Sequence, residues 1–491
     1  MFYKGDNPAI GRAMAAVAEA IPHAEVDSTR PVYHFRPPSQ LMSDPNGPIY
    51  YKGWYHLFYQ FNPYSNEFPP LPSSPGGEWK WNWHWGHAKS RDLVHWEHLP
   101  IALWPSREKG EEHCASGCTV VNDRGQPMIL YTSMGTGNSY IDKAQQWAAL
   151  ACDDDLVIWE KYQHNPIIPE SVHGNLKIYQ WRDLFVFKNK ERTFLVMGGK
   201  LGPDAGNDAV VLLYEAKDGT LTQWKYCGIL FRHPDKNLIS VEVPSFLRLG
   251  DKWVLITNSY RIPPFVEWYI GDFDIERCMF TVESNGIVDG ERDCFYAGTV
   301  FSDGRGRQIL LGCISRGYLK GTGWHGCLSL PRVLSLGEHG ELLQDPIPEL
   351  ETLRGKHVEV SDVVLGTHVI KDIVGDTLEI HARVNISTAK VAGIRLRPYG
   401  KDEKAVDIRY DGGWIKVNDA QTPLRLLEGE KTLDLRVFLD KRVVEVFANR
   451  RACVTQVIEP GRCGFGVEVF AEGGKARLSH MDLWEIIPVW Q

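Results

Sequence analysis

Three acidic side chains stand just before segments that favour β-strands. Asp44 precedes Ile49-Tyr50-Tyr51, and Asp183 and Glu242 stand before strand-favouring runs of their own. Carboxyl groups that converge in a desolvated pocket repel one another, and burial raises the pKa of at least one of them. One protonated and one ionised carboxyl group are what the hydrolysis of a glycosidic bond requires. The guanidinium of Arg182, next to Asp183 in the chain, is expected to keep that carboxyl group ionised.

Each of these residues also has an ordinary structural explanation. Asp44 lies before Pro45-Asn46-Gly47, where a carboxylate commonly caps a turn. An ion pair with Arg182 would account for Asp183, and a solvated strand edge would account for Glu242. The two interpretations differ in whether the three carboxylates occupy the same position in a repeated unit.

A pair of strands joined by a tight turn recurs five times, at intervals of roughly 55 to 70 residues. The pairs are Ile49–Tyr51 with Trp54–Tyr59, Thr119–Val121 with Met128–Tyr131, Leu184–Phe187 with Thr193–Met197, Ser245–Leu249 with Lys252–Ile256, and Thr299–Phe301 with Gln308–Leu311. Each interval leaves room for two more strands, which predicts an all-β, five-bladed β-propeller around a central channel. Equivalent positions in the blades would bring together, at one end of the channel, the residues that precede the pairs: Asp44, Ser116, Asp183, Glu242 and Tyr296.

The rest of the chain follows two other patterns. Beyond residue 353, short strands with alternating apolar and polar residues, such as Asp376–Ile386 and Leu433–Leu439, predict a β-sandwich. Near the start, an Ala-rich stretch with apolar residues at helical spacing predicts a helix over 7–21. The expected organisation is a partly helical N-terminal extension (1–30), a propeller (31–354) and a C-terminal β-sandwich (355–491), the last two packed directly because no low-complexity linker separates them.

The composition argues against several classes of partner. A net charge of −8 without a basic cluster disfavours nucleic acid and an anionic membrane surface. The 17 Trp and 19 Tyr residues suit a flat, aromatic-lined sugar pocket as well as they suit core packing. The ten cysteines are scattered without a CxxC pair or a zinc-type spacing, so neither a redox motif nor a structural metal is predicted.

The N-terminal sequence sets an expectation about location. Its apolar stretch at 13–18 is short and ends at Glu19, so no signal peptide is predicted, and no apolar run reaches transmembrane length. We therefore expect a cytoplasmic protein if Met1 is the native start, and a secreted protein otherwise. No self-complementary face marks an oligomeric state.

Longer motifs extend the analysis beyond single residues. In chain order they are Ser43-Asp44-Pro45-Asn46-Gly47, Phe58-Tyr59-Gln60-Phe61-Asn62-Pro63, Trp85-Gly86-His87-Ala88, Ser116-Gly117, Arg182-Asp183, Glu242-Val243-Pro244 and Leu328-Ser329-Leu330-Pro331-Arg332. Together they resemble the β-fructofuranosidases of glycoside hydrolase family 32, the group of invertases, inulinases and levanases. The resemblance covers nearly the whole chain after about residue 30, and it implies the same propeller and β-sandwich.

The resemblance also implies an activity and a set of roles. It implies a retaining hydrolase that removes terminal β-D-fructofuranosyl residues from a fructose-containing oligosaccharide through a covalent fructosyl-enzyme intermediate. Asp44 would be the nucleophile, Glu242 the general acid and base, and Asp183 a stabiliser of the oxocarbenium-like transition state. The expected sugar contacts are Asn46, Gln60, Trp81, Trp85, Ser116, Arg182, Tyr296 and Trp324. No metal or cofactor is implied, and we interpret His84 and His87 as hydrogen-bonded structural residues.

The chain departs from the family pattern at several positions. The family usually has asparagine, an aromatic residue, proline and cysteine where this chain has Ser43, Ala115, Leu184 and Val243. These departures leave sucrose, sucrose 6-phosphate, inulin, levan and a difructose dianhydride open as substrates. A fructosyltransferase is an alternative on the same scaffold, because a sugar hydroxyl can replace water at the intermediate. A non-catalytic carbohydrate-binding protein is a further alternative, against which the crowded carboxylates argue.

Overall fold

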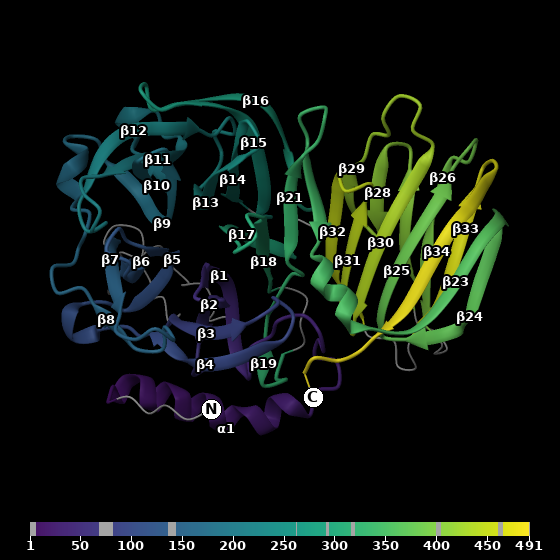
Figure 1. Ribbon diagram of the computed structural model, residues 1–491, viewed down its shortest axis with the longest axis horizontal. Coiled ribbons are helices and arrows are strands. Elements are labelled where there is room, and N and C mark those ends of the chain that lie inside the picture. The colour runs from purple at the N-terminus through teal and green to yellow at the C-terminus, as the bar shows by residue number, and fades with distance from the viewer. Residues whose placement is uncertain are drawn as a thin grey trace.

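The computed structural model describes residues 6–67, 82–135, 144–261, 263–290, 294–315, 320–398, 404–459 and 465–490. Within these ranges the strands form seven sheets in two bodies that lie side by side (Figure 1). Short 3₁₀ helices lie at Arg107–Lys109, Glu170–His173, Pro203–Ala205 and Pro348–Leu353. None of the helices formed by the described residues is long and apolar enough to cross a membrane.

Five of the sheets surround a common centre, as the repeated strand pairs predict, and form a five-bladed propeller (Figure 1). Their inner strands contact one another around a closed ring, in the order β1 (Gln40–Tyr51), β5 (His113–Val121), β9 (Ile178–Asn189), β13 (Ser240–Leu249), β17 (Phe295–Ser302) and back to β1. All five predicted hairpins are confirmed by the pairings β1–β2, β5–β6, β9–β10, β13–β14 and β17–β18. The fold prediction is therefore correct for this part of the chain.

The remaining propeller strands lie outward from the inner ring. They are β2 (Trp54–Asn62), β3 (His84–Ser90), β4 (Trp96–Leu103), β6 (Pro127–Met134), β7 (Gln145–Ala151), β8 (Trp159–Lys161), β10 (Arg192–Leu201), β11 (Ala209–Ala216), β12 (Trp224–Arg232), β14 (Lys252–Tyr260), β15 (Phe265–Asp274), β16 (Met279–Ile287), β18 (Gln308–Ile314), β20 (Cys327–Leu328), β21 (Arg332–Leu336) and β22 (Leu342–Pro346). A late strand, β19 (Trp324–His325), pairs in parallel with the start of β1 and so joins the first sheet.

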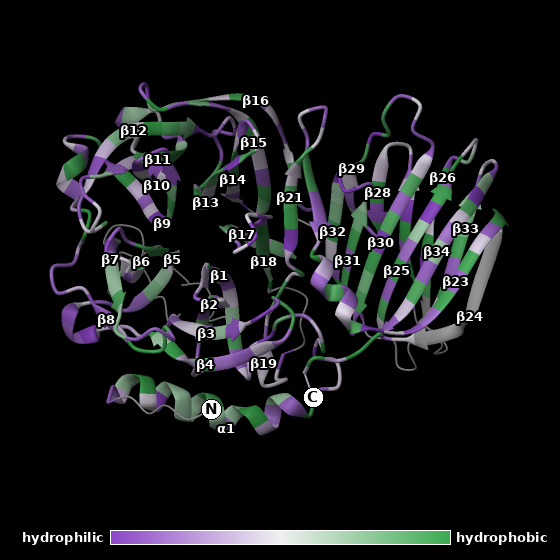
Figure 2. Cartoon of the chain, viewed as in Figure 1, coloured by the Kyte–Doolittle hydropathy of each residue, from purple (hydrophilic) through white to green (hydrophobic). Residues whose placement is uncertain are grey.

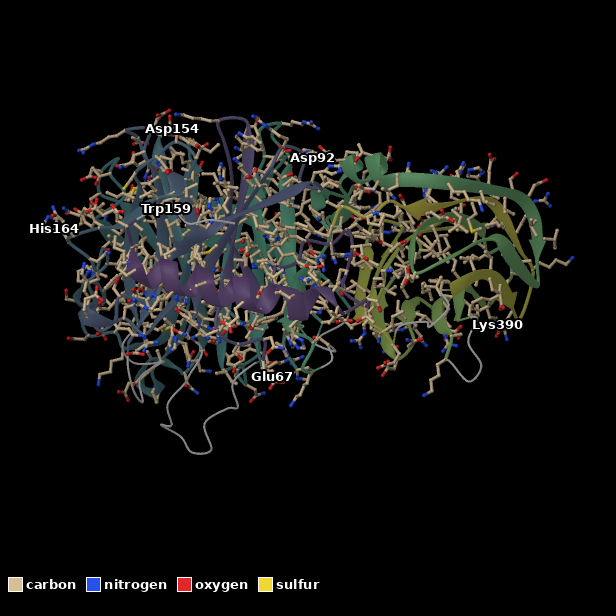
Figure 3. All side chains as sticks on the ribbon, turned by 90° about the horizontal axis from the view of Figure 1, so that it is seen from below. Glu67, Asp92, Asp154, Trp159, His164 and Lys390 are labelled. Carbon is tan, nitrogen blue, oxygen red and sulfur yellow. The ribbon has the colours of Figure 1, made fainter. Side chains whose placement is uncertain are left out.

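The propeller has two different faces. The tight turns between paired strands lie at one face, and the turns that contain Asp92 and Asp154 mark it at the top of Figure 3. The segment that contains Glu67 lies at the opposite face, at the bottom of the same view. The backbone of Ser65 accepts a hydrogen bond from Leu41 at 3.0 Å, so the start of β1 lies at this second face. We call the two the turn face and the site face.

The second body is the predicted β-sandwich, made of two six-stranded sheets among the described residues. One sheet holds β23 (Arg354–Leu365), β34 (Ala476–Ile486), β25 (Thr377–Asn385), β30 (Thr432–Asp440), β31 (Val443–Ala448) and β32 (Ala452–Val457). The other holds β24 (Thr367–Gly375), β33 (Phe465–Glu472), β26 (Val391–Pro398), β27 (Val406–Asp411), β28 (Trp414–Val417) and β29 (Ala420–Pro423). Hydropathy alternates along β25 and β30 (Figure 2), because alternate side chains enter the core between the sheets.

The N-terminal helix is longer than predicted. The helix α1 (Pro8–Glu25) begins after the cap Asn7, whose side chain accepts hydrogen bonds from two backbone N–H groups of the first turn. It buries the predicted apolar residues Ile10, Met14 and Val17. The helix continues beyond residue 21 through Pro22, although proline cannot donate the backbone bond of an inner turn.

The stretch from Asp44 to Gly47 is not the turn that its composition suggests. It lies within the continuous strand β1, and the hairpin reverses at Lys52-Gly53, between the two predicted strands. Pro45 and Gly47 distort the strand but do not end it. Gly47 has a φ of +44°, and it lies so close to the next blade that an added Cβ would meet Thr119 at 2.5 Å. Asp44 is therefore held by a distorted strand.

Buried charges join the two bodies. Arg332 of the propeller donates to Asp289 at 2.9 Å and to Glu445 of the sandwich at 2.7 Å. His34 lies between two sandwich carboxylates, with Nδ1 2.8 Å from Asp440 and Nε2 3.1 Å from Glu445. All five side chains are buried, so the propeller, the sandwich and the N-terminal arm share one ionic cluster.

This cluster predicts a loss of stability at alkaline pH. Burial alone would lower the pKa of His34, but hydrogen bonds to Asp440 and Glu445 raise it to about 9. The folded protein thus keeps a proton that the unfolded chain releases near pH 6.5. The stability that His34 contributes is complete below pH 6.5 and is lost as pH rises through 9, with a slope of at most about 1.4 kcal/mol per pH unit.

Urea unfolding between pH 6 and 9.5 would measure this slope. We expect His34→Gln to lower the free energy of unfolding at pH 6 and to flatten its decrease towards pH 9. His164→Gln, at an exposed histidine, should follow the wild-type curve. Parallel curves for wild type and His34→Gln would show that His34 does not hold the additional proton.

Candidate active site

Every inner strand of the propeller carries a register shift near the site face. In β1, Met42 and Pro45 pair with Phe61 and Tyr59, so β1 contains one residue more than β2 there. The same shift lies between Cys114 and Gly117 in β5, at Asp183 in β9, between Glu242 and Ser245 in β13, and between Tyr296 and Thr299 in β17. A β-bulge bends its strand and redirects the side chains beside it. The five bulges are where the five predicted residues come together.

The sequence suggested that these residues occupy equivalent positions in the repeat. In the structure their positions differ. Asp44 and Ser116 stand directly before the residue at which pairing resumes, whereas Glu242 and Tyr296 stand three residues before it. Asp183 is itself the additional residue of its bulge. A shift of two residues along a strand keeps a side chain on the same face, so both arrangements direct the side chain to the channel.

The bulges also strain the backbone. Asp183, Val243 and Ala297 have φ values of 66°, 39° and 51°, in the left-handed region that such residues seldom adopt. A conformation of this kind costs on the order of 1–3 kcal/mol and is concentrated at functional sites. The strain therefore points to the same end of the channel as the carboxylates do.

Asp44 is held by two hydroxyl groups. Ser43 donates to its Oδ1 at 2.9 Å and Ser116 donates to its Oδ2 at 2.7 Å. Gln60 in turn donates to the Ser116 hydroxyl at 3.0 Å. Burial raises the pKa of Asp44, the two hydroxyl groups oppose this rise, and the negative charge of Glu242 adds to it. The side chain remains partly exposed, so the carboxylate is fixed and yet open to a ligand.

Asp183 and Glu242 lie on either side of Arg182. The guanidinium donates to Glu242 and has its Nε 3.7 Å from Asp183. Tyr296 donates to the other oxygen of Glu242 at 2.7 Å. The backbone N–H of Val243 donates to Asp183 at 3.0 Å. The structure thus brings all three predicted catalytic carboxylates into one cluster, and the guanidinium of Arg182 lies among them.

The expected effect of Arg182 on Asp183 is only partly present. Burial raises the pKa of Asp183 to about 7, and Arg182 lowers it without restoring the ordinary value. The reason is geometric, since the hydrogen bonds of the guanidinium go to Gln180 and Glu242 and not to Asp183. Burial therefore favours the protonated form of Asp183 more than the sequence suggested, and Arg182 opposes this effect only in part.

The predicted sugar contacts fall into two groups. Gln60, Ser116, Arg182 and Tyr296 are bonded to the carboxylates or to each other. Asn46, Trp85 and Trp324 lie below the surface, each with 2% exposure or less. Trp85 donates to the Ala115 carbonyl at 3.0 Å and lies 3.1 Å from the amide oxygen of Asn46. Trp81 lies outside the described residues, and all these binding roles stay predictions.

Several supporting residues were missed by the sequence analysis. Thr132 fixes the backbone of β9, because its hydroxyl accepts a hydrogen bond from the Asp183 backbone N–H at 3.0 Å. Asn258 is fully buried, bonds the Val243 carbonyl at 3.0 Å and accepts from the Gly298 N–H at 2.8 Å. Burial raises the pKa of the Cys313 thiol, and the nearby charge of Asp44 adds to the rise. All three lie on second strands or bond to backbone, where motif spacing gives no signal.

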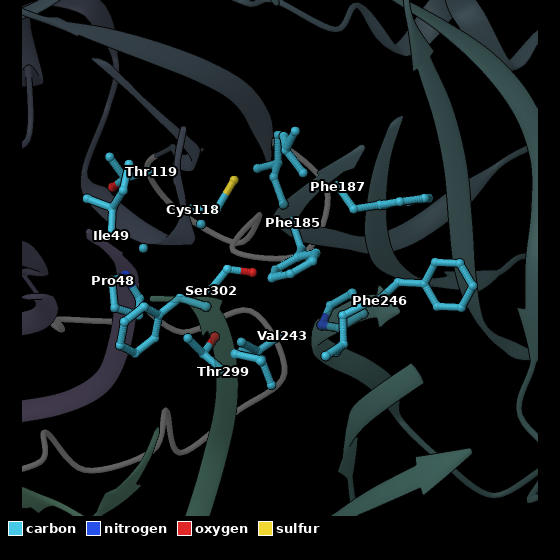
Figure 4. A pocket seen from close by; sticks show the side chains of 18 of the residues that line it. Pro48, Ile49, Cys118, Thr119, Phe185, Phe187, Val243, Phe246, Thr299 and Ser302 are labelled. Atoms are coloured by element: carbon cyan, nitrogen blue, oxygen red, sulfur yellow. The ribbon is translucent and has the colours of Figure 1, made fainter. Parts of the chain in front are cut away.

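A cavity of about 390 Å³ extends along the inner strands from Asp183 towards the turn face. Figure 4 shows side chains that line it. Its lining includes Pro48, Phe185, Val243 and Thr299 from different inner strands, and Asp183 at its inner end. Asp183 is therefore where the channel from the turn face meets the carboxylate cluster.

The histidines near the site have structural partners. His84 Nδ1 lies 2.8 Å from the Asn82 carbonyl, and His87 Nε2 lies 3.0 Å from Nδ1 of His56. The part of the chain that the structure describes holds no group of three or more His, Cys, Asp or Glu side chains arranged to bind a metal.

Comparison with known proteins gives a consistent result over most of the chain. The models described as "Glycosyl hydrolases family 32 N-terminal domain" and "Glycosyl hydrolases family 32 C terminal" match residues 34–346 and 349–485. The chain is 31% identical to the sucrose-6-phosphate hydrolase of Escherichia coli, over 93% of this chain and 94% of that protein. It is 28% identical to the levanase of Bacillus subtilis (strain 168), over 97% of this chain and 73% of that protein.

Solved structures share the fold. Fructan 1-exohydrolase IIa of Cichorium intybus superposes with a TM-score of 0.80 at 23% identity, over 94% of this chain and 98% of that chain. A β-fructofuranosidase of Bombyx mori, solved in complex with sucrose, superposes with a TM-score of 0.79 at 25% identity, over 99% of this chain and 100% of that chain.

The role of Asn258 in building the site can be tested by stability. We expect Asn258→Ala to lower the free energy of unfolding in urea by about 2–4 kcal/mol, because buried backbone groups at two bulges lose their partner. Asn237→Ala, at an exposed asparagine, should change it by less than about 0.5 kcal/mol. Equal stabilities of the two variants would show that the bulges hold without Asn258.

Proposed function

We propose that this chain, which belongs to glycoside hydrolase family 32, removes terminal β-D-fructofuranosyl residues from a fructose-containing oligosaccharide with retention of anomeric configuration. One observation carries the proposal, namely that Asp44, Asp183 and Glu242 from three blades converge around Arg182 at the site face. The catalytic roles assigned below are part of the proposal.

In the first step a carboxylate oxygen of Asp44 attacks the anomeric carbon of fructose. The bond to the leaving oxygen breaks as Glu242 donates its proton to that oxygen. The fixed position of Asp44 supports this role, because hydrogen bonds from Ser43 and Ser116 orient both of its oxygens. The product of the step is a fructosyl ester of Asp44.

In the second step Glu242 removes a proton from water, and the water oxygen attacks the anomeric carbon. The ester bond to Asp44 breaks, which releases fructose and restores the carboxylate. Positive charge develops on the sugar ring in both transition states, and a negative charge on Asp183 would stabilise it. Arg182, Gln60 and Tyr296 have polar groups in the same cluster and are suited to bind the hydroxyl groups of the sugar.

The substrate is open among several fructosides. The Escherichia coli and Bacillus subtilis relatives are named for sucrose 6-phosphate and levan, so both compounds belong in the test.

Product analysis tests the proposed activity. Purified protein would be incubated with sucrose, sucrose 6-phosphate, inulin, levan and a difructose dianhydride, and free fructose and new oligosaccharides would be measured. We expect fructose from at least one substrate, with the retained anomer seen first by proton NMR. Asp44→Asn should reduce the rate by on the order of 10³-fold or more.

The outcomes are distinct. New oligosaccharides without net fructose would replace hydrolysis by fructosyl transfer. Intact substrates in every incubation with a folded protein would contradict the proposal and favour a binding protein. An inverted product would contradict the roles of Asp44 and Glu242.

The proposed acid role of Glu242 predicts a dependence on the leaving group. On the fructoside that product analysis identifies as a substrate, Glu242→Gln should lower kcat by roughly 10²- to 10⁴-fold, because the leaving oxygen must depart without a proton. On an aryl β-D-fructofuranoside with an acidic phenol, the loss in the bond-cleavage step should be at least about tenfold smaller. Equal losses on both substrates, measured as release of the sugar leaving group and as pre-steady-state phenol release, would mean that Glu242 does not act as the acid.

A further inference from the structure

The end of helix α1 and the residues that follow it form a segment that reaches β19, the strand paired with the start of β1. This segment, His23–Arg30, precedes the region 34–346 that the family model matches. We call it the N-terminal clasp. Helix α1, which leads into it, packs along β4 at the outside of the first sheet (Figure 1; Figure 3). The clasp thus lies outside the region that the family model matches.

The clasp holds one side chain of the predicted sugar site. Asp27 Oδ2 accepts a hydrogen bond from the indole Nε1 of Trp324 at 2.8 Å. The guanidinium of Arg30 lies over the indole ring, 5.4 Å from its centre. Thr29 fixes Asp27 in turn, because its backbone N–H and its hydroxyl donate to Oδ1 at 2.9 and 2.8 Å. The indole is therefore held at its polar edge and on its face by the same short segment.

The clasp also holds the backbone around Trp324. His23 Nε2 lies 2.9 Å from the Gly321 carbonyl. Gly323 has a φ of +77°, and an added Cβ would lie 2.7 Å from the His23 ring and 2.8 Å from the Ala24 backbone. Only glycine fits this approach, so the segment before Trp324 is pressed directly against the clasp.

From Trp324 the contact continues to the nucleophile. Gln40 and Leu41 of β1 pair in parallel with Trp324 and His325 of β19. The Gln40 N–H donates to the Gly323 carbonyl at 2.9 Å. Ser43 and Asp44 follow Leu41 by two and three residues, and the Ser43 hydroxyl donates to the Asp44 carboxylate. The clasp, β19 and the beginning of β1 therefore form one connected unit beside Asp44.

We propose that Asp27 is a positioning residue for the sugar site, which acts by fixing Trp324, a predicted sugar contact whose strand β19 pairs with the beginning of β1. This inference rests on the proposed function. Asp27 itself touches no reacting atom. Because Trp324 would contact the fructosyl group equally in the ground state and in the transition state, loss of its position should weaken substrate binding and leave the chemical step unchanged.

Asp27→Asn is a sharp test, because it keeps the size of the side chain. The single amide oxygen of asparagine cannot accept both from Thr29 and from Trp324, and its NH₂ group would face the indole N–H. We expect KM for the fructoside to rise about tenfold, with kcat within about twofold of wild type. Glu19→Gln, at an exposed position of α1 that removes the same charge, should leave both constants unchanged.

A double-mutant cycle separates positioning from a general loss of structure. Trp324→Phe removes the indole donor and should raise KM by a similar factor. In that background Asp27→Asn should add less than about twofold, because the interaction is already absent. Independent, multiplicative effects, or an unchanged KM in Asp27→Asn, would overturn the inference. Assays are run well below the melting temperature of each variant, determined by circular dichroism.

Two further results keep the test decisive. If Asp27→Asn does not fold, Thr29→Val removes one of the donors to Asp27 and should raise KM two- to threefold, and an unchanged KM would overturn the inference. If the wild-type protein releases no fructose from any substrate, the proposed function itself is wrong. Fructose release with KM insensitive to both Asp27→Asn and Thr29→Val refutes only the role of the clasp.

Discussion

Three carboxylates close together in a half-buried pit form the constraint on which the site is built. Asp44, Asp183 and Glu242 repel one another, and the guanidinium of Arg182 lies among them. The remaining stabilisation comes from neutral donors: the hydroxyls of Ser43, Ser116 and Tyr296, and the backbone N–H of Val243. Each β-bulge therefore turns a side chain into the channel. The bulge in β13 also frees the backbone N–H of Val243 from the sheet, so that this N–H can bond Asp183.

The buried cluster around Arg332 has a comparable role between the two bodies. Arg332 contacts Asp289 within the propeller, and Glu445 and Thr455 of the sandwich. A buried ion pair of this kind contributes little net stability, since desolvation offsets the attraction, but its geometry is specific. The cluster fixes how the sandwich is oriented against the fifth blade, and His34 includes the N-terminal arm in the same arrangement.

The hairpins could be predicted from the sequence because strand alternation and turn residues are local signals. The convergence of Asp44, Asp183 and Glu242 followed from the repeat, but the bulges did not, since a bulge is defined only by the partner strand. The same limit explains the error about Asp44 to Gly47, where Pro45 and Gly47 shape a strand with residues that usually shape a turn.

Longer-range features had no local signal at all. The parallel pairing of β19 with β1 involves two residues of a short strand, far away in the chain. The direction of the Arg182 guanidinium depends on Gln180, whose φ of 52° is a property of the folded strand. The proline and cysteine expected at Leu184 and Val243 are absent. At Val243 the contact to Asp183 comes from the backbone, so it does not depend on which side chain is present.

The parallel pairing of β1 with β19 has a consequence for the order of folding. Asp27 and Trp324 are 297 residues apart, so the first sheet cannot be completed until the chain has been synthesised almost through the fifth blade. Closing a loop of this length costs conformational entropy, and contacts of such high sequence separation form slowly. Until then β1 remains an edge strand that a second chain can pair with. The strand that carries Asp44 is therefore the first propeller strand to leave the ribosome and among the last to reach its final place.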